Sequence, residues 1–263
     1  FKEVSLGYDE ATAVDEANRC LHCKHQPCVA GCPVNVQIPE FISLIKEGKF
    51  LEANDKIKET SALPAVCGRV CPQESQCEAK CVRGIKGEPV AIGRLERFAA
   101  DYAGKVPPPA CAASTGKKIA IIGGGPGGLS AAYYLQLMGH QTTVFEMLPK
   151  LGGMLRYGIP NYRLPKERLD DDINAILETG VKVEYGKRIG TDITIQELRK
   201  EYDAVLITIG ASTDKKLGIE GESAEGVISA VRFLRDVGKN LNPDLAGQEV
   251  AVIGGGNVSM DAV

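Results

Sequence analysis

The sequence lacks a long hydrophobic run, an excess of basic residues and a visible signal peptide. Its longest apolar stretch, Ala204 to Ala211, is far shorter than the roughly 20 residues that a membrane-spanning helix requires. Charged residues make up 25% of the chain and the formal net charge is -3, so no basic surface favours a nucleic-acid or anionic-membrane partner. We therefore expect a cytoplasmic protein with neither partner. The chain begins with Phe1 rather than Met, so we expect that an upstream segment has been removed.

Cysteine is almost absent outside one segment. Eight of the nine cysteines lie between Cys20 and Cys81, and only Cys111 lies beyond them, where we expect an incidental thiol. Such clustering favours metal ligation in a reducing compartment over a disulfide framework or unligated thiols. The first run reads C-x2-C-x4-C-x3-C-P, which is neither a zinc-ribbon pair nor the run of small bacterial ferredoxins, so iron and zinc both stay open. His22 and His25 could ligate metal, but we expect them to be flanking polar residues.

The chain changes character at a linker. Before it, short helices are predicted at residues 15–19, 39–47, 50–60 and 90–103, with Gly48 and Gly104 at helix ends and loops that carry the cysteines. The stretch 105–118 is rich in Pro, Ala, Ser and Gly without apolar periodicity, which is typical of a linker. After it, strands and helices alternate, which predicts an α/β fold behind an α-helical head. The predicted organisation is a helical domain (1–104), the linker (105–118), a first nucleotide-binding domain (119–245) and the start of a second (246–263).

The part after the linker opens with a dinucleotide-binding pattern. A strand at 119–122, a glycine turn, a helix at 127–138 and a strand at 142–145 are predicted in succession. Gly123, Gly125 and Gly128 have the spacing G-x-G-x-x-G, which permits a tight turn, close approach of backbone to a pyrophosphate, and close helix–strand packing. The pyrophosphate would lie at the helix N-terminus, and Glu146 could accept hydrogen bonds from a ribose. The pattern predicts a Rossmann-like domain.

A second, incomplete copy of this pattern closes the chain. Gly254 and Gly256 follow a predicted strand at 250–253, and Ser259 replaces the third glycine with another small residue. Only seven residues follow Gly256, whereas a βαβ unit needs about 30. We therefore expect a fragment that stops inside its second nucleotide-binding module, before the residue that would distinguish NAD from NADP.

Five motifs, in order, give the chain a family resemblance. They are EANRCLHC, CGRVCPQESQCEAKC, GGGPGGLSAA, YGIPNYRLP and GGGNVSMDA, and they extend across the whole chain. With them the sequence resembles the small (beta) subunit of glutamate synthase, the large subunit of NADH-dependent ferredoxin:NADP oxidoreductase and the N-terminal part of dihydropyrimidine dehydrogenase. The resemblance implies an α-helical iron–sulfur domain with two 4Fe-4S clusters, a Rossmann-like FAD domain and the start of a domain that binds NADP or NAD.

The resemblance also implies an activity. Electrons would pass from NAD(P)H through FAD and the clusters to a larger partner subunit of glutamate synthase type, which makes glutamate from glutamine and 2-oxoglutarate. The alternatives are a subunit of a ferredoxin-linked NAD(P)H transhydrogenase and, from a different class, a zinc-stapled docking domain. Because the cofactors would carry the chemistry, we expect no catalytic side-chain acid or base.

Individual cofactor-binding residues follow from the resemblance as well. The FAD turn and its ribose acid would be Gly123, Gly125, Pro126, Gly127, Gly128 and Glu146, and the next loop would add Met147, Leu151, Gly152, Gly153 and Met154. Arg163 aligns with a flavin contact, against the alternative of a surface guanidinium. Ile189 lies beside the adenine in similar proteins, against the alternative of a core side chain. The second turn would contribute Gly254, Gly255, Gly256, Asn257 and Ser259.

Eight cluster ligands can be chosen in two ways. Simple counting offers the cysteines at 20, 23, 28, 32, 67, 71, 77 and 81. In two-cluster ferredoxins, however, the cysteine before a proline reaches the other cluster, and both Cys32 and Cys71 precede a proline. We assign one cluster to Cys20, Cys23, Cys28 and Cys81. We assign the other cluster to Cys32, Cys71 and Cys77. For the eighth ligand, thiolate chemistry favours Cys67 and the resemblance favours Glu96, which we prefer; by default Glu96 and Arg97 would be solvated charges.

Overall fold

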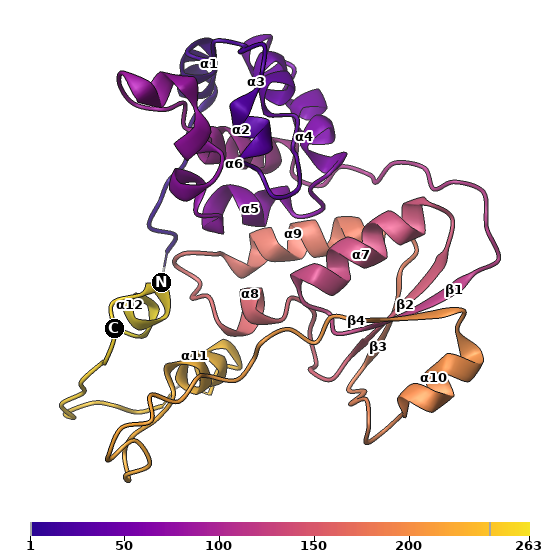
Figure 1. The fold of residues 1–263 in the computed structure, drawn as a ribbon, viewed down its shortest axis with the longest axis vertical. Helices are drawn as coiled ribbons and strands as arrows, with labels where there is room; N and C mark the ends of the chain where they lie inside the picture. The colour runs from indigo at the N-terminus through magenta and orange to yellow at the C-terminus, as the bar shows by residue number, and fades with distance from the viewer. Residues whose placement is uncertain (1, 242) are drawn as a thin grey trace.

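The helical part of the protein forms one lobe (Figure 1, indigo to magenta). The computed structural model describes every residue except 1 and 242. The helices of this lobe are α1 (Glu10–Asn18), α2 (Pro27–Ala30), α3 (Ile38–Lys46), α4 (Phe50–Lys58), α5 (Pro64–Val70) and α6 (Ile92–Ala103), and its 3-10 turns are η1 (Gln73–Ser75), η2 (Glu78–Lys80) and η3 (Val82–Ile85). Within the described chain, every helix is too short or too polar to cross a bilayer.

Apolar residues at helical spacing build the core of this lobe. Phe41, Ile42 and Ile45 recur on one face of α3 and are buried. Phe50 of α4 packs edge-on against Phe98 of α6, with ring centroids 5.0 Å apart. Burying a side chain of this size contributes about 1.5–3 kcal/mol, so this core holds the short helices together.

The helix ends in this lobe follow local signals. Helix α3 stops just before Gly48 and α6 stops at Gly104, both with positive φ (+73° and +55°), as predicted. Helix α1 begins at Glu10 rather than at residue 15. The reason is that the side chain of Asp9 accepts a hydrogen bond from the backbone N–H of Thr12 at 2.8 Å and so caps the helix earlier than predicted.

Helix α5 stands where the sequence predicted a loop around Cys67. Pro64 occupies its first turn, a position that tolerates the missing N–H. Gly68 lets α5 cross α6 at very short range, since a Cβ built there would lie 2.5 Å from the backbone nitrogen of Arg97. A seven-residue helix is marginal by itself, so tertiary packing rather than local propensity explains why α5 forms.

The second lobe is built on a parallel four-stranded sheet with strand order β3-β2-β1-β4. Its strands are β1 (Lys118–Ile122), β2 (Gln141–Glu146), β3 (Lys182–Tyr185) and β4 (Ala204–Ile207), and its helices are α7 (Pro126–Leu137), α8 (Met154–Tyr157), α9 (Lys166–Leu177), α10 (Ile195–Glu201), α11 (Ala230–Gly238) and α12 (Asn257–Ala262). Elements β1, α7 and β2 lie within one residue of their predicted ranges. The linker therefore ends one residue early, at 117.

The two faces of the sheet are covered differently. Ile121 and Val144 share a core with α7 and α9, whereas Ala120, Ile122 and Phe145 pack on the other face. Helix α10 covers that second face (Figure 1). The central strand β1 pairs with β2 on one side and β4 on the other, so the turn that follows β1 is fixed by the whole sheet.

The predicted strand at 250–253 is wrong for this structure. These residues carry no strand pairing, and Val250 and Ile253 are 60% and 78% exposed. A parallel strand needs a neighbour to accept its hydrogen bonds, and no described strand lies beside this segment. The following helix α12 nevertheless begins at the predicted turn, with Gly256 as its N-cap.

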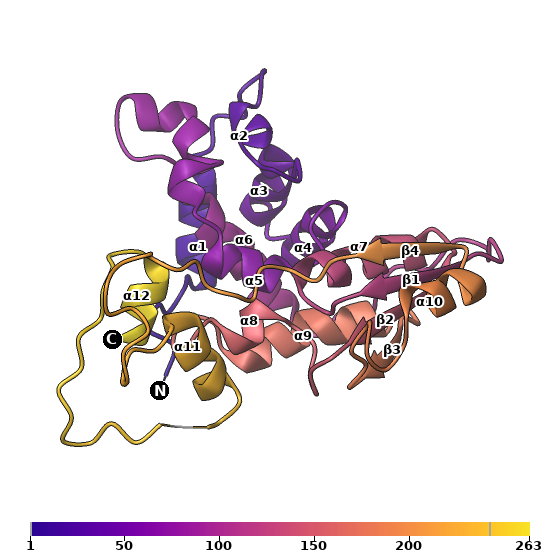
Figure 2. The ribbon, with the colours of Figure 1, turned by 60° about the horizontal axis from the view of Figure 1, so that its bottom comes forward.

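The two lobes share a core through α5. Figures 1 and 2 show α5 lying against α9, and Leu63 and Val66 pack with Leu169 and Ile173 of that helix. The N-terminal segment adds a second link. There the backbone N–H of Val4 donates a hydrogen bond to the carbonyl of residue 162 at 3.0 Å. The helical lobe is therefore held against the nucleotide-binding lobe by these contacts as well as by the linker.

Candidate iron–sulfur and nucleotide sites

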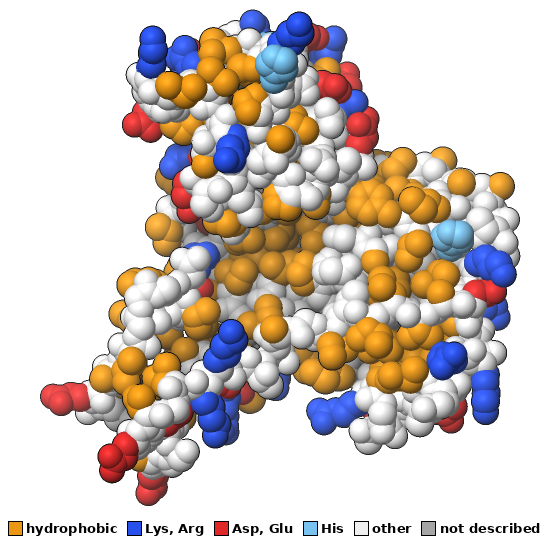
Figure 3. Space-filling model, viewed as in Figure 1, with side chains coloured by type: hydrophobic (Ala, Val, Ile, Leu, Met, Phe, Trp, Pro, Cys, Tyr) orange, Lys and Arg blue, Asp and Glu red, His pale blue; other side chains and the backbone are white. Residues whose placement is uncertain are grey.

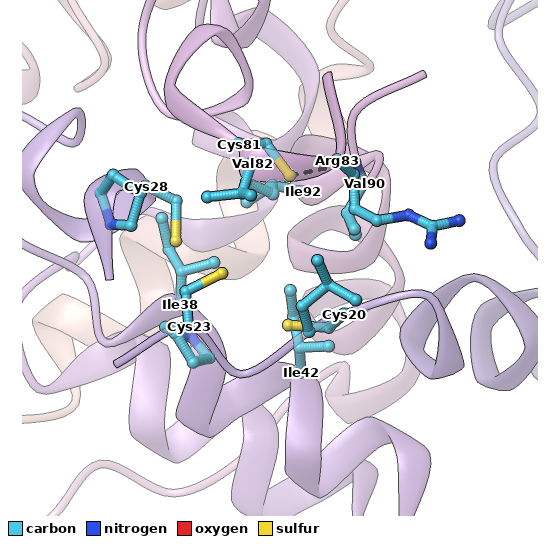
Figure 4. Close-up of a pocket in the computed structure, with 13 residues that line it drawn as sticks. Cys20, Cys23, Cys28, Ile38, Ile42, Cys81, Val82, Arg83, Val90 and Ile92 are labelled. Carbon is cyan, nitrogen blue, oxygen red and sulfur yellow. Dashed lines mark hydrogen bonds between the residues drawn. The ribbon is translucent and has the colours of Figure 1, made fainter. Parts of the chain in front are cut away.

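Four cysteine side chains meet around one cavity of the helical lobe (Figure 4). They come from both ends of the cysteine-rich segment: Cys20 after α1, Cys23 in the next loop, Cys28 in α2 and Cys81 between η2 and η3. Their sulfur atoms point toward the space between them, which has a volume of about 380 Å³ including open solvent. The Cys81 sulfur also accepts a hydrogen bond from the N–H of Val90 at 3.5 Å. The structure thus brings together the four cysteines that we assign to the first cluster.

The walls of this cavity are mostly apolar, with isoleucine, valine, leucine and proline side chains between the cysteines. Burial raises the pKa of Cys28 to about 11 and also raises that of Cys20, so the thiols favour the protonated form until a metal group compensates the thiolate charge. No three His, Cys, Asp or Glu side chains in the described chain converge on the position of one metal ion. Four sulfur donors spread around a cavity instead fit an iron–sulfur cluster. His22 and His25 are exposed and do not line it.

The remaining predicted ligands gather around Cys71, at the C-terminal end of α5. The Cys67 thiol donates a hydrogen bond to Cys71, which lowers the pKa of Cys71 and raises that of Cys67. Glu96, Cys77 and Cys32 lie close enough to act on the pKa of Cys71 in the opposite direction. Burial raises the pKa of Cys77 itself to about 12. Cys32 and Cys71, the two cysteines that precede a proline, are therefore near one another, and their assignment to one cluster stays a prediction.

Glu96 and Arg97 of α6 are both buried, so the default expectation of solvated charges is wrong for them. Burial, then Cys67 and Asp172, raise the pKa of Glu96 well above its usual range. A buried carboxyl group of this kind requires a cation or a metal to compensate its charge when it ionises. The structure places Cys67 and Glu96 together beside Cys71, and it leaves both of them as candidates for the eighth ligand.

A network of partly buried ion pairs adjoins this second set, and no pattern in the sequence indicated it. Arg69 of α5 is 2% exposed and pairs with Glu3 at 2.8 Å and with Asp101 at 2.7 Å. Arg97 of α6 joins the same two carboxylates, at 3.0 and 3.4 Å. In the sequence, Arg97 directly follows Glu96, and Arg69 lies two residues before Cys71. The network therefore fixes α5 and α6 together, with the charges of its two arginines balanced by those of Glu3 and Asp101.

A single carboxylate of the nucleotide-binding lobe reaches the start of α5. Asp172 of α9 accepts a hydrogen bond from the backbone N–H of Val66 at 3.1 Å. Burial raises the pKa of Asp172 to about 7, although this hydrogen bond and nearby lysine and arginine side chains oppose the shift. A carboxylate near the N-terminus of a helix is stabilised by the positive end of the helix dipole, so Asp172 links α5 to the nucleotide-binding lobe.

The first glycine turn has the geometry that its sequence predicts. Gly123 adopts φ +106°, Gly125 is the N-cap of α7, and a Cβ built at Gly128 would lie 1.9 Å from the carbonyl oxygen of Gly123. Glu146 ends β2, as predicted, and its carboxylate accepts a hydrogen bond from the N–H of Gly124 at 2.8 Å. The turn is therefore tight and closely packed, and it is hydrogen-bonded to Glu146, the acid predicted to contact a ribose.

Thr208, just after β4, is a residue of this turn that the sequence did not single out. Its hydroxyl lies 2.9 Å from the carbonyl oxygen of Ile122 and 3.1 Å from that of Gly123. It also lies 2.8 Å from a Cβ built at Gly128. No local pattern could have indicated this contact, because the pairing of β4 with β1 brings residues more than 80 positions apart together.

The loop after β2 folds back over the turn. The N–H of Gly152 donates to the carbonyl of Gly124 at 2.8 Å, and a Cβ built at Gly153 would lie 2.8 Å from the Cα of Gly125. Leu151 is buried in the core beneath. The loop can therefore approach the turn only because both positions are glycine, which fits the predicted wrapping of a nucleotide.

The other predicted FAD residues differ in where they lie: some begin helices, one is exposed, one forms an ion pair and one packs in the core. Pro126 and Gly127 form the first turn of α7, Met154 begins α8, and Met147 is exposed. Arg163 forms an ion pair with Asp261 of α12, with both carboxylate oxygens 2.7 Å from its Nη1. Ile189 forms an isolated bridge with Ile193, and its side chain packs against the core around Phe145. That packing matches the alternative that Ile189 fills the core.

The second glycine turn keeps its local shape without a sheet around it. Gly254 adopts φ +132°, Gly256 is the N-cap of α12, and the Ser259 hydroxyl would lie 2.5 Å from a Cβ built at Gly254. Nothing lies within 4 Å of a Cβ built at Gly255 or Gly256. The predicted nicotinamide-nucleotide residues, including Asn257 at the start of α12, therefore lie together on an open surface.

Family models and a solved structure agree with this architecture. A model described as dihydropyrimidine dehydrogenase domain II, 4Fe-4S cluster, matches residues 1–106, and one described as pyridine nucleotide-disulphide oxidoreductase matches residues 117–262. The structure of Mycobacterium tuberculosis FprA in complex with NADPH is similar at a TM-score of 0.50 and 30% identity, over 55% of this chain and 35% of FprA. The fold class and the predicted cofactor classes, 4Fe-4S clusters, FAD and a nicotinamide nucleotide, are confirmed by these matches.

Curated relatives are longer than this chain. The beta subunit of NADP(+)-dependent formate dehydrogenase from Moorella thermoacetica is 42% identical over 89% of this chain and 37% of its own length. The small chain of NADPH glutamate synthase from Escherichia coli K12 is 36% identical over 100% of this chain and 58% of its own length. The NAD-dependent dihydropyrimidine dehydrogenase subunit PreT from Salmonella typhimurium is 38% identical over 98% of this chain and 63% of its own length.

The chain thus spans only part of these relatives, between 37% and 63% of their length. The resemblance read from the sequence is confirmed, because relatives named as glutamate synthase small chain and as a dihydropyrimidine dehydrogenase subunit are among the matches. The oxidoreductase model alone covers more than half of the residues. The chain therefore belongs to the pyridine nucleotide-disulphide oxidoreductase family, with a 4Fe-4S domain of the dihydropyrimidine dehydrogenase type ahead of it.

Proposed function

We propose that the protein passes electrons from NAD(P)H through FAD and two 4Fe-4S clusters to a larger partner subunit in the cytoplasm. The observation that carries the proposal is the cavity in which four cysteines from separate segments meet, in a lobe packed against a nucleotide-binding sheet. A nicotinamide gives up two electrons as hydride, a cluster accepts one at a time, and a flavin can do both. The chain itself needs to position these groups and to control their surroundings.

The residues of the chain have separate positioning roles in this proposal. The glycine turn, latched by Glu146 and covered by the loop with Gly152 and Gly153, would hold the FAD pyrophosphate at the start of α7. The second turn would hold the nicotinamide nucleotide in the same way. Helix α5 would connect the two lobes, since it carries Cys67 and donates a backbone hydrogen bond to the carboxylate of Asp172 in the other lobe.

We assign the cluster ligands as two interlocked sets. The first is Cys20, Cys23, Cys28 and Cys81, and the second is Cys32, Cys71, Cys77 and Glu96. The first set is supported because its four cysteines line one cavity. The second set is supported because its other members lie near Cys71. Because each set draws on both cysteine-rich segments, neither segment can bind its cluster without the other.

Absorption spectroscopy and metal analysis of the anaerobically purified full-length protein test this proposal. We expect broad brown absorption that bleaches on reduction, flavin absorbance, and about eight iron atoms per chain for two clusters with four irons each. A colourless protein that contains zinc would overturn the proposal in favour of a zinc-stapled docking domain.

The choice between Glu96 and Cys67 is tested with two variants. We expect Cys67→Ser to keep both clusters and Glu96→Ala to lose or alter one of them, as measured by iron content and by the EPR spectrum of the reduced protein. A carboxylate has the same charge as a thiolate but is a harder and weaker donor to iron, so the identity of the eighth ligand affects the potential of the cluster, and the two variants should also differ in their redox titrations. Loss of a cluster in Cys67→Ser with normal spectra in Glu96→Ala would reverse the assignment.

The partner that we propose is of glutamate synthase large-subunit type. The glutamate synthase small chain from Escherichia coli, which matches over 100% of this chain, supports it. Relatives that are 42% identical are named as beta subunits of formate dehydrogenase and of NADPH-Fe(3+) oxidoreductase, so another redox subunit is the second candidate; the ferredoxin-linked transhydrogenase is a third. Co-purification followed by an NADPH-dependent assay of glutamate formation from glutamine and 2-oxoglutarate separates them. A complex that reduces another substrate and forms no glutamate would contradict our choice.

A further inference from the structure

An open groove lies directly beside the cysteine cavity. It has a volume of about 780 Å³ including open solvent, and it is lined by Arg19, Leu21, Val82, Arg83, Ile85, Lys86, Gly87 and Glu88. Leu21, Val82 and Arg83 also line the cysteine cavity, so the two spaces share a wall. A group seated in the groove is thus separated from a cluster in the cavity by a single layer of side chains.

The groove combines exposed apolar residues with positive charge. Leu21 and Ile85 are 53% and 77% exposed, and with Val82 they form an apolar part of the groove lining next to charged residues. Arg83 and Lys86 form no ion pair among the residues that the structure describes, and Glu88 is the single acid in the lining. Figure 3 shows hydrophobic side chains beside Lys and Arg side chains at the top of this lobe. The surface therefore complements an acidic partner with an apolar contact point.

The groove is also held in a fixed shape. The guanidinium of Arg19 pairs with Glu16 at 2.6 Å and donates hydrogen bonds to the carbonyls of Glu88 and Pro89 at 2.7 and 3.2 Å. Glu16 in turn accepts a hydrogen bond from the N–H of Ala91 at 2.8 Å. These contacts tie the loop that carries Lys86 to α1, so binding would not have to order it first.

We propose that this groove docks an acidic partner protein that carries a one-electron acceptor, and that electrons leave the helical lobe here. The inference rests on the proposed function, because it takes the cysteine cavity as a cluster site. One electron would pass from the reduced cluster to the acceptor, without any bond made or broken and without a proton. The apolar residues would exclude water from the contact, while Arg83 and Lys86 would steer and orient the acidic surface.

Binding of an acidic ferredoxin probe to the oxidised holoenzyme tests the site by itself. We expect Lys86→Glu to weaken the Kd by about tenfold or more at low salt, and high salt to weaken wild-type binding in the same way. The control is Lys200→Glu, which makes the same charge change on an exposed position of α10 far from the groove and should bind like the wild type. Cross-linking with a carbodiimide should join Lys86 to a carboxylate of the probe.

Several results would overturn the proposal. They are wild-type binding that ignores salt, equal Kd values for Lys86→Glu and the wild type, or equal binding of a basic cytochrome c probe. Binding to anionic lipid vesicles that depends on Lys86, without binding of ferredoxin, would assign the groove to a membrane instead. Ile85→Ser should also weaken binding, at any salt concentration, and normal binding there would remove the apolar contact from the proposal. A protein with zinc and no iron would refute the proposed function, whereas the Kd comparison would still report on docking.

Discussion

The two glycine turns have nearly the same local shape and very different surroundings. The N-caps Gly125 and Gly256 have φ,ψ of -78°,-176° and -86°,176°, and the opening glycines Gly123 and Gly254 both have positive φ. The first turn follows a strand with partners on both sides, whereas the segment before the second pairs with no strand among the residues that the structure describes. The comparison teaches that the residues of the motif specify the turn and the helix start, but that a strand requires its neighbours.

The difference extends to the contacts that hold each turn. The first is latched by Glu146, covered by Gly152 and touched by Thr208. Around the second, a Cβ built at Gly255 or Gly256 meets nothing. Substitutions at the closely packed positions of the first turn should therefore have large effects, and matching changes in the second turn should have small ones.

The largest expected effect is that of Gly128→Ala in the full-length protein. Its Cβ would lie 1.9 Å from the carbonyl oxygen of Gly123, a backbone atom that cannot move aside without distorting the turn. We expect loss of bound FAD and destabilisation by about 3 kcal/mol, at the upper end of overpacking costs. Flavin absorbance per chain and thermal unfolding measure both effects.

Gly127→Ala is the control for that prediction. A Cβ there would meet only the Thr208 side chain, at 3.9 Å, which is an ordinary contact. It should fold with wild-type stability. Equal losses of stability in the two variants would show that the close approach at Gly128 does not distinguish this turn.

Glu146→Gln should have the next largest effect. The carboxylate accepts hydrogen bonds from the N–H groups of Gly124 and Leu148, both at 2.8 Å, and an amide can satisfy only one of them. We expect a loss of about 1.5–3 kcal/mol, the value of one charge-assisted hydrogen bond, and weaker binding of FAD in a fluorescence titration. Glu184→Gln removes the same charge from an exposed position of β3 and should change neither quantity.

The sequence predicted the first turn well because its signals are local. The apolar run of β1, the glycine spacing and the helix that follows lie within about 30 residues, the span of one βαβ unit. The prolines after Cys32 and Cys71 also allowed a division of the cysteines into two sets, and this division stays a prediction. Both predictions rest on residues that are close together in the sequence, which is why the sequence alone suffices to make them.

The rest depended on long-range contacts. Helix α5 forms because Gly68 lets it cross α6, and no local periodicity reveals that crossing. Arg97 is buried because Glu3, more than 90 positions away, joins it with Arg69. Asp172 meets α5 from the other lobe. Arg97 and Asp172 are ordinary polar residues in the sequence, and only the tertiary structure supplies their partners.

Thr208→Val should have a smaller effect on the first turn. The change keeps the shape of the side chain and removes the hydroxyl that lies near the carbonyls of Ile122 and Gly123. We expect a loss of about 1 kcal/mol in a denaturant titration, with bound FAD retained. Thr213→Val, at an exposed position without a strand neighbour, serves as the control and should match the wild type.

The smallest expected effect is that of Ser259→Gly, which would make the second motif identical in spacing to the first. Glycine lowers helix propensity in α12 by only about 0.5 kcal/mol relative to serine, and no strand packs closely against this helix start in the described chain. We therefore expect the affinity of the full-length protein for NADPH, measured by titration of flavin fluorescence, to change less than about threefold, which corresponds to that energy. A tenfold gain in affinity would mean that the serine hydroxyl near Gly254 limits how closely a nucleotide can approach. The two turns would then differ in their own residues as well as in their surroundings.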